Sequence, residues 1–229
     1  MHSRRRVLGL VGSSSVLALS GCLDFVTGQG AYEVESDPAR VSPSTAGDTG
    51  YELQEVSEEV IEEQFEVAGQ QRSVEATNYV ATYERTVEFG PLGEAALAVF
   101  AVLSTPAVEI AGQTLNPVAN YDNERLVRLL ASNYESLEVR GEAETLTYAP
   151  FDTEYEATKF DAVAQFEGQE VEVFVQVGSV RHEEDFLVPI AVYPQDRAED
   201  EEPVVADLTE SLDHPADVEV TTATSSNSS

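Results

Sequence analysis

Two neighbouring stretches of the chain alternate apolar and polar residues with the period of a β-strand. Over residues 170–177, valine occupies every second position and mostly polar residues lie between, and residues 155–166 alternate in the same way. Because the side chains of a strand point alternately to opposite faces, each stretch predicts a half-buried strand. The Glu-Gly-Gln sequence at residues 167–169 supplies a turn, so the two strands form a hairpin.

Four further strands are predicted from runs of apolar residues. Residues 186–193 extend the hairpin into an antiparallel meander, with Pro189 at an edge or a bulge because proline cannot donate to a ladder. Upstream, residues 60–67 and 74–87 are expected to pair across a short turn. The continuous apolar run at residues 95–103 is interpreted as a buried strand.

Helical periodicity appears twice. Large apolar residues recur at helical spacing over residues 122–137, behind Asp122 as an N-cap, and predict the main helix. A shorter helix follows Pro203 and ends at the Asp-His-Pro sequence of residues 213–215. Together these elements predict an α+β fold, an antiparallel sheet of about five to seven strands with the main helix and the short C-terminal helix packed on one face.

Composition divides the chain into segments. Residues 22–50 are rich in Gly, Ser, Pro, Asp and Thr without an apolar period, and predict a lipidated N-terminus followed by a flexible linker. Residues 51–215 contain no internal linker or repeat and predict a single domain. Residues 216–229 are expected to form a disordered tail. The glycosylation sequon at Asn227 lies too close to the chain end for its use to be expected.

The N-terminus has the pattern of an export signal. Residues 1–21 carry three arginines and then an apolar run that is about 20 Å long as a helix, too short for a bilayer core of roughly 30 Å. This segment therefore predicts a signal peptide rather than a membrane span. Arg4, Arg5 and Leu8 lie in a sequence that resembles the twin-arginine signal, which implies export through a translocase for folded proteins.

A lipid anchor is predicted directly after this segment. Leu19, Ser20 and Gly21 precede Cys22, and the four residues resemble a lipobox. The resemblance implies that a signal peptidase cuts before Cys22 and that its thiol carries a lipid, which anchors the protein on the outer face of the cell membrane. Cys22 is the only cysteine of the chain, so an internal disulfide and a cysteine-rich zinc site are excluded.

The net charge is strongly negative. The chain has 12 basic residues against 43 acidic ones, a net charge of −31, and without residues 1–21 the charge is −34. Arginine supplies eleven of the basic residues, and Lys159 is the only lysine. This composition resembles that of proteins from salt-loving archaea. Such a surface is tolerated in concentrated salt, because the Debye length at about 1 M salt is roughly 3 Å and the repulsion between carboxylates is screened. Binding to nucleic acid is excluded, since it requires basic residues that neutralise phosphates.

Few residues are candidates for chemistry. Nucleophile-elbow, P-loop, dinucleotide-binding, zinc-protease and EF-hand motifs are absent from the sequence, so no catalytic residue and no cofactor is predicted. His182 lies beside Glu183 and Asp185 in a predicted turn, where the three are weak candidates for a metal site and otherwise form a solvated turn. The acidic run at residues 199–202 is interpreted as a solvated loop, and His214 as part of a helix stop.

Tyrosines on the predicted strands allow two interpretations. They either line an aromatic groove or pack in the core and on the sheet. These residues are Tyr79, Tyr83, Tyr148, Tyr155 and Tyr193.

Two segments resemble a family of haloarchaeal lipoproteins that is classed as a domain of unknown function. They are residues 112–117 (Gly-Gln-Thr-Leu-Asn-Pro) and residues 180–194, and the resemblance extends over residues 4–194. The order of strands and helix also resembles that of PsbP-like α+β domains. The family resemblance implies a place at the cell surface and no reaction.

These observations predict a lipid-anchored, acidic surface protein of a halophilic archaeon that acts as a non-catalytic binding or assembly module. Its partner is a cell-surface protein or a small ligand. The alternative is a small carboxylate- or cation-dependent hydrolase. A pocket with converging carboxylates would favour the hydrolase, and a sheet face or groove with exposed tyrosines would favour binding.

Replacing Cys22 tests the lipid anchor. Cys22→Ser removes the thiol that would carry the lipid, so this variant is expected in the soluble fraction after cell fractionation, whereas the unchanged protein sediments with membranes. Immunoblotting of both fractions measures the distribution. A variant that stays in the membrane fraction contradicts the lipid anchor.

Overall fold

The computed structural model describes residues 32–222, apart from residues 68–69, 90–92, 111–112, 115, 117, 119–120, 134–136 and 167. The predicted signal peptide, twin-arginine residues, lipobox and Cys22 lie outside the described residues, as do residues 223–229 of the predicted tail. Within the described part of the chain, no helix is both long and apolar enough to cross a membrane.

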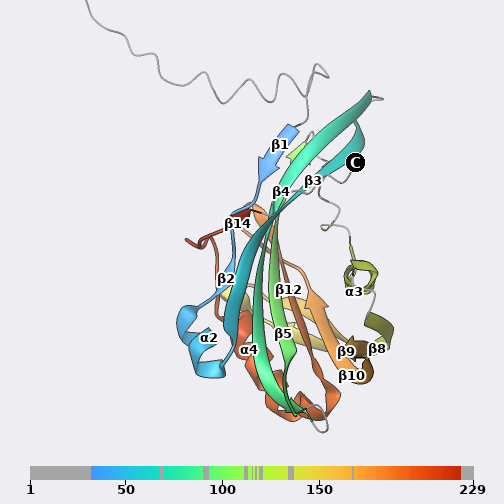
Figure 1. The fold of residues 1–229 in the computed structure, drawn as a ribbon. Helices are drawn as coiled ribbons and strands as arrows, with labels where there is room; N and C mark the ends of the chain where they lie inside the picture. Colours follow the sequence, from blue (N-terminus) through green and yellow to red (C-terminus); the bar gives the residue numbers. More distant parts are fainter. Residues whose placement is uncertain are drawn as a thin grey trace, which may run out of the picture.

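Three α-helices and a large sheet make up the described fold (Figure 1). The helices are α2 (Pro43–Thr49), α3 (Asn123–Asn133) and α4 (Ala198–Glu210). The strands are β1 (Tyr32–Glu35), β2 (Arg40–Val41), β3 (Glu52–Val67), β4 (Gln70–Phe89), β5 (Gly93–Pro106), β6 (Glu109–Ile110), β7 (Gln113–Thr114), β8 (Leu137–Tyr148), β9 (Tyr155–Phe166), β10 (Gln169–Gly178), β11 (Val180–His182), β12 (Asp185–Pro194), β13 (Leu212–Asp213) and β14 (Thr221–Thr222).

The main sheet has ten strands in the order β14-β3-β4-β5-β12-β10-β9-β8, with β1 beside β4 and β11 beside β12. The predicted hairpin β9–β10, its extension to β12 and the β3–β4 pair are present, and the α+β class is confirmed. The sheet is larger than the predicted five to seven strands. The additional strands are β8, which is mostly exposed and has no apolar period, and the short β1, β11 and β14.

Pro189 lies inside the sheet in a continuous register with β5, so neither the predicted edge nor the predicted bulge is found there. β12 runs between β5 and β10, and Pro189 is the partner of Val102 on β5. On its other side, the pairing with β10 ends at Ile190 and the pairing with β11 begins at Leu187. Proline is tolerated there because its position falls between two ladders, where no neighbour needs its N–H.

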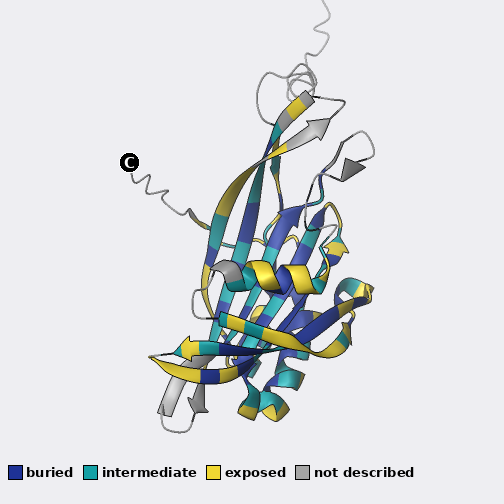
Figure 2. Ribbon diagram, turned by 90° about the vertical axis from the view of Figure 1, so that its right-hand side faces the viewer, coloured by how far each residue is buried: buried dark blue, intermediate teal, exposed yellow. Residues whose placement is uncertain are grey.

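The helices lie on both faces of the sheet, which corrects the prediction that they share one face. Val205 and Leu208 of α4 pack in a core with Tyr193 of β12, whereas Val127 of α3 packs in a second core with Val175 of β10. Figure 2 shows α3 across one face with its outward side exposed. β12 contributes alternate residues to the two cores, as the period of a strand requires.

The folded part begins before residue 51, although residues 22–50 are predicted as a linker. Ala39 and Val41 are buried, and the Val41 N–H donates to the Tyr83 hydroxyl at 2.9 Å. At the other end, Ala216 is buried and its N–H donates to the Pro38 carbonyl at 2.8 Å. Both segments are mostly polar, so the few apolar residues that pack them against the rest of the fold do not stand out in the sequence.

Helix α4 begins at Ala198, so the acidic residues 199–202 form a helical turn and not the predicted solvated loop. Pro203 lies inside the helix rather than before it. Acidic side chains favour a helix N-terminus because its free N–H groups carry partial positive charge. The helix therefore begins before Pro203, whereas the sequence analysis predicted that it begins after Pro203.

Glu201 of this turn is fully buried. Its carboxylate pairs with the Arg85 guanidinium from β4 and accepts a hydrogen bond from the Tyr51 hydroxyl at 3.1 Å. Burial and the neighbouring Glu201 charge raise the pKa of Tyr51 well above its usual value, so this hydroxyl stays a donor. Arg85 also donates to the Thr49 carbonyl at the end of α2 at 3.1 Å. This network fixes α4 and α2 to the sheet.

Lys159 of β9 makes a second ionic contact with the same turn. Its ammonium lies 2.8 Å from Glu202 of α4 and 2.6 Å from Glu144 of β8. Burial alone lowers the pKa of Lys159, but the two carboxylates outweigh it and raise that pKa above its usual value. The only lysine of the chain therefore links β9 to β8 and α4.

Removing Arg85 is expected to destabilise the fold strongly. Arg85→Ala leaves the Glu201 carboxylate buried without a counter-charge, which costs about 3 to 5 kcal/mol of unfolding free energy. The control Arg140→Ala breaks an exposed pair with Glu172 at 3.5 Å and costs less than about 1 kcal/mol. Chemical denaturation of both variants measures the difference. Equal losses would contradict the role of the Glu201 network.

Candidate functional site

The predicted turn containing His182, Glu183 and Asp185 joins β11 to β12. His182 and Asp185 face each other as partners in the ladder, whereas Glu183 lies in the turn with a left-handed backbone (φ 53°) and is exposed. The structure adds His214, which the sequence analysis interpreted only as part of a helix stop. We call His182, His214 and Asp185 the histidine cluster.

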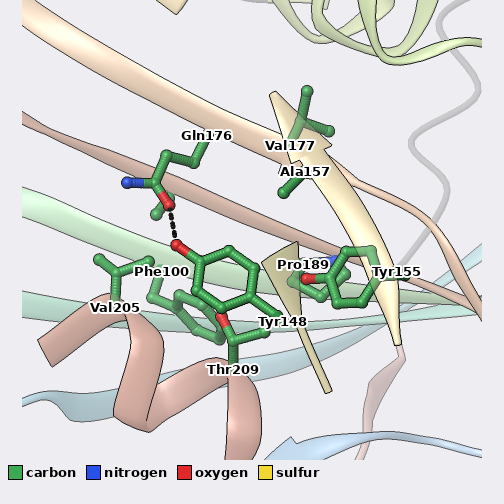
Figure 3. Close-up of a pocket in the computed structure, with 10 residues that line it drawn as sticks. Phe100, Tyr148, Tyr155, Ala157, Gln176, Val177, Pro189, Val205 and Thr209 are labelled. Atoms are coloured by element: carbon green, nitrogen blue, oxygen red, sulfur yellow. Dashed lines mark hydrogen bonds between the residues drawn. The ribbon is translucent and has the colours of Figure 1, made fainter. Parts of the chain in front are cut away.

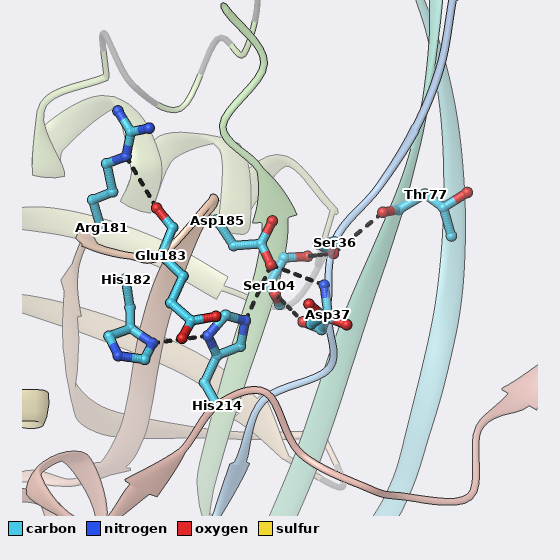
Figure 4. A network of polar contacts seen from close by, with 9 residues as sticks. All are labelled: Ser36, Asp37, Thr77, Ser104, Arg181, His182, Glu183, Asp185 and His214. Atoms are coloured by element: carbon cyan, nitrogen blue, oxygen red, sulfur yellow. Dashed lines mark hydrogen bonds and ion pairs between the residues drawn. The ribbon is translucent and has the colours of Figure 1, made fainter. Parts of the chain in front are cut away.

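The histidine cluster is a continuous chain of polar contacts (Figure 4). His214 Nε2 lies 3.1 Å from Asp185 Oδ2, and His214 Nδ1 lies 3.0 Å from His182 Nδ1. The His214 side chain is fully buried and that of Asp185 is 6% exposed. One set of tautomers satisfies every contact, with His214 donating to Asp185 through Nε2–H and accepting from His182 Nδ1–H.

Chemically, this arrangement orients two imidazoles and holds a proton between them. Phe151 stacks on the His182 ring at a centroid distance of 3.9 Å, which fixes the outer imidazole. Among the described residues, no group of three or more His, Cys, Asp or Glu side chains is arranged to hold a metal ion. The three weak metal candidates, His182, Glu183 and Asp185, therefore do not form such a group.

The same cluster joins segments that are remote in sequence. Asp185 also accepts the backbone N–H of Asp37 at 2.8 Å, and Ser104 donates to the Asp37 carbonyl at 2.5 Å. Ser36 donates in turn to the Ser104 carbonyl at 3.0 Å. The cluster thus fastens the chain ahead of β2 and the chain after β13 to the sheet. No local sequence signal predicts the whole cluster, because His214 comes from a segment remote from the turn that holds His182 and Asp185.

Tyr148, Tyr155 and Tyr193 belong to a second polar group, which lies beneath α4; Figure 3 shows Tyr148 and Tyr155. Tyr148 donates to Gln176 at 2.7 Å, and Gln176 donates to the Tyr193 hydroxyl at 2.5 Å. Tyr155 and Thr209 line the same pocket, whose cavity of about 10 Å³ has room for about one water molecule. All five tyrosines named from the sequence are buried, so the packing interpretation holds and the groove does not form.

Burial keeps these hydroxyls neutral. It raises the pKa of Tyr148 to about 12 and raises those of Tyr155 and Tyr193 further. Tyr155 also requires a glycine at position 178, since a Cβ there would lie 2.7 Å from its ring. Tight packing and neutral tyrosines indicate a structural core rather than a reaction site.

A third feature is a ribbon of β3 and β4, with β1 beside part of it, that extends beyond the body (Figure 1). The pairing of β4 with β5 ends at Tyr79, but β3 and β4 continue to pair from Glu59 to Val67. We call residues 59–67 of β3 and 70–78 of β4 the arm. β1 runs parallel to β4 along the arm. Val60 and Ile61 of the arm are exposed at 52% and 46%.

Comparison with known proteins identifies a family. The family described as Domain of unknown function (DUF6517) matches residues 38–213. No curated protein matches the chain.

Two solved structures are similar to the chain. The crystal structure of PA94, a protein of unknown function from Pseudomonas aeruginosa, is 12% identical, with 65% of this chain and 94% of that one covered and a TM-score of 0.34. The solution structure of cyanobacterial PsbP (CyanoP) from Synechocystis sp. PCC 6803 is 9% identical, with 80% and 95% covered and a TM-score of 0.39. Scores this low do not place the chain in the fold family of either protein.

Removing the Asp185 carboxylate is expected to loosen both terminal segments. Asp185→Ala leaves the buried Nε2–H of His214 and the partly buried backbone N–H of Asp37 without an acceptor, at a cost of about 2 kcal/mol or more of unfolding free energy. Asp185→Asn keeps an acceptor oxygen and loses less. The control Glu184→Ala changes an exposed side chain of the same turn by less than about 0.5 kcal/mol. If the denaturation midpoints of Asp185→Ala and Glu184→Ala coincide, the cluster does not stabilise the packing of the two terminal segments on the sheet.

Proposed function

Because the chain belongs to the DUF6517 family, a domain of unknown function, we propose its function from its own residues: a lipid-tethered binding or assembly domain. The lipid on Cys22 and the export signal at residues 1–21 place it on the outer face of the membrane of a halophilic archaeon. The net charge of −34 after signal removal supports this environment. A translocase and a signal peptidase act on it during export.

The main support for a binding function is the set of exposed apolar side chains on β3, two of which lie in the arm. Three of the four large apolar side chains that are exposed among the described residues lie on β3, namely Leu53, Val60 and Ile61. Val60 and Ile61 are consecutive, so they point to opposite faces of the arm. The arm is a narrow ribbon in which β1 adds a third strand only opposite Val74–Thr77, so it has little stability of its own in water, and exposed apolar side chains add none. A partner that covers the arm would account for both features.

The alternative of a carboxylate-dependent hydrolase has less support. The cavity beneath α4 is far smaller than the several hundred Å³ typical of ligand pockets. The buried carboxylate of Glu201 pairs with Arg85, and that of Asp185 accepts from His214 and Asp37. Both carboxylates therefore have structural roles, which leaves binding as the better-supported function.

Charging the arm is expected to release the protein from its assembly. Membranes of cells that produce the protein are solubilised in mild detergent and separated by native electrophoresis. The unchanged protein is expected in a complex well above the mass of one chain, which is 24.8 kDa before the signal peptide is removed. Val60→Asp combined with Ile61→Asp is expected to shift it to the monomer, because two buried charges would oppose association.

The matched control is Leu129→Asp, which charges a comparably exposed side chain (44%) on α3. It is expected to leave the complex intact. Circular dichroism checks that all variants fold. A monomer in unchanged membranes, or a complex that survives the double substitution, contradicts assembly through the arm.

A further inference from the structure

Along the arm, the outer edge of β3 pairs with no other strand among the residues that the structure describes. β3 lies next to the end of the sheet, and its outer neighbour, β14, pairs with only Ser57 and Glu58. From Glu59 to Val67, β3 has no partner on that side among the described residues. Every second residue of an edge strand points its N–H and C=O outward, and these unpaired groups are a template for a further strand.

We propose that this edge binds an extended, basic segment of a partner protein, which adds to β3 as a further strand. The inference rests on the proposed binding function and specifies how the arm would perform it.

The chain already uses this edge in the proposed way. Thr221 and Thr222 of β14 add to it in parallel, opposite Ser57 and Glu58. The open stretch begins at the next residue, Glu59, so a second segment would continue an existing ladder. Strand addition to a sheet edge is a common mode of peptide recognition, in which backbone hydrogen bonds supply affinity and alternate side chains supply specificity.

The opposite edge of the sheet, β8, is less suited to this role. Its register with β9 is interrupted twice, between Val139 and Gly141 and between Glu142 and Glu144. Such irregularities twist an edge and block further pairing. On β3, the register with β4 is continuous from Glu55 to Val67. The open edge on the arm is therefore the regular one.

The charges of the arm specify a basic partner. Glu62 of β3, Glu75 of β4 and Glu33 of β1 are successive partners across the ribbon, so three glutamates form one row on one face. Like charges in adjacent strands repel one another. A lysine or arginine placed beside Glu62 by an added strand would offset this repulsion.

The other face of the arm specifies apolar residues. Ile61, Ala76 and Val34 form the neighbouring row across the same three strands. An added strand would place one residue beside Glu62 and the next beside Ile61, on opposite faces. The segment that fits thus alternates basic and β-branched apolar residues. A second copy of β3 does not fit, because β3 contains no lysine or arginine and would oppose glutamate with glutamate.

A synthetic peptide tests the inference on the full chain. The probe is a fluorescein-labelled ten-residue peptide of alternating arginine and valine, and fluorescence anisotropy measures its affinity at a salt concentration at which the protein is folded. Glu62→Lys combined with Glu75→Lys, both in the glutamate row, is expected to weaken binding at least tenfold. The control, Glu138→Lys with Glu142→Lys on β8, changes the net charge equally and is expected to alter affinity less than twofold.

A second peptide separates strand pairing from charge attraction. Replacing two central valines by proline keeps its charge and removes two N–H donors, so affinity is expected to fall at least tenfold. Equal affinity for both peptides, equal weakening by both double variants, or no binding would overturn strand addition. So would dimerisation of the free protein through β3 in sedimentation analysis.

The results distinguish this inference from the proposed function. If the native complex depends on Val60 and Ile61 but the peptide does not bind, strand addition is wrong and assembly through the arm stands. If the peptide binds as expected but solubilised membranes contain only monomer, the edge is confirmed and the assembly role is contradicted.

Discussion

The buried carboxylate of Glu201 is the constraint on which the described fold depends. A fully buried charge is stable only when it is paired, and Arg85 of β4 and Tyr51 ahead of β3 provide the partners. The contact fixes α4 against β4, which pairs with β3 from Gln70 to Glu84 and continues from the body into the arm. The arm is therefore an extension of strands that the core holds in place.

The regular elements could be predicted from the sequence because their side chains follow one period. The valines of β10 and Leu126 of α3 mark buried faces, and the structure contains both elements, although α3 ends at Asn133 rather than at residue 137, where β8 begins. The start of α4 was mispredicted because Pro203 suggested a boundary and the acidic run suggested solvent. Only the tertiary contact with Arg85 shows that Glu201 faces inward, and no local pattern encodes that contact.

The candidate sites were less accessible to sequence reasoning. His182 and Asp185 were named from their proximity in a turn, but their third partner, His214, lies about 30 residues away and is brought close by the chain after β13. The rows of Glu62 and Ile61 on the arm depend on the register of three strands, one of them from the predicted linker. Registers of this kind follow from tertiary packing rather than from composition, so the acidity of the chain alone did not indicate a binding edge.

The central claim is that β3 has an open outer edge along the arm, and hydrogen exchange of the full chain without a partner tests it most directly. Amides in residues 59–64 that point away from β4 are expected to exchange rapidly, because nothing in the described fold pairs with them. Amides of β10, which is paired on both sides, are expected to stay protected. Protection of residues 59–64 as strong as that of β10 would contradict the account.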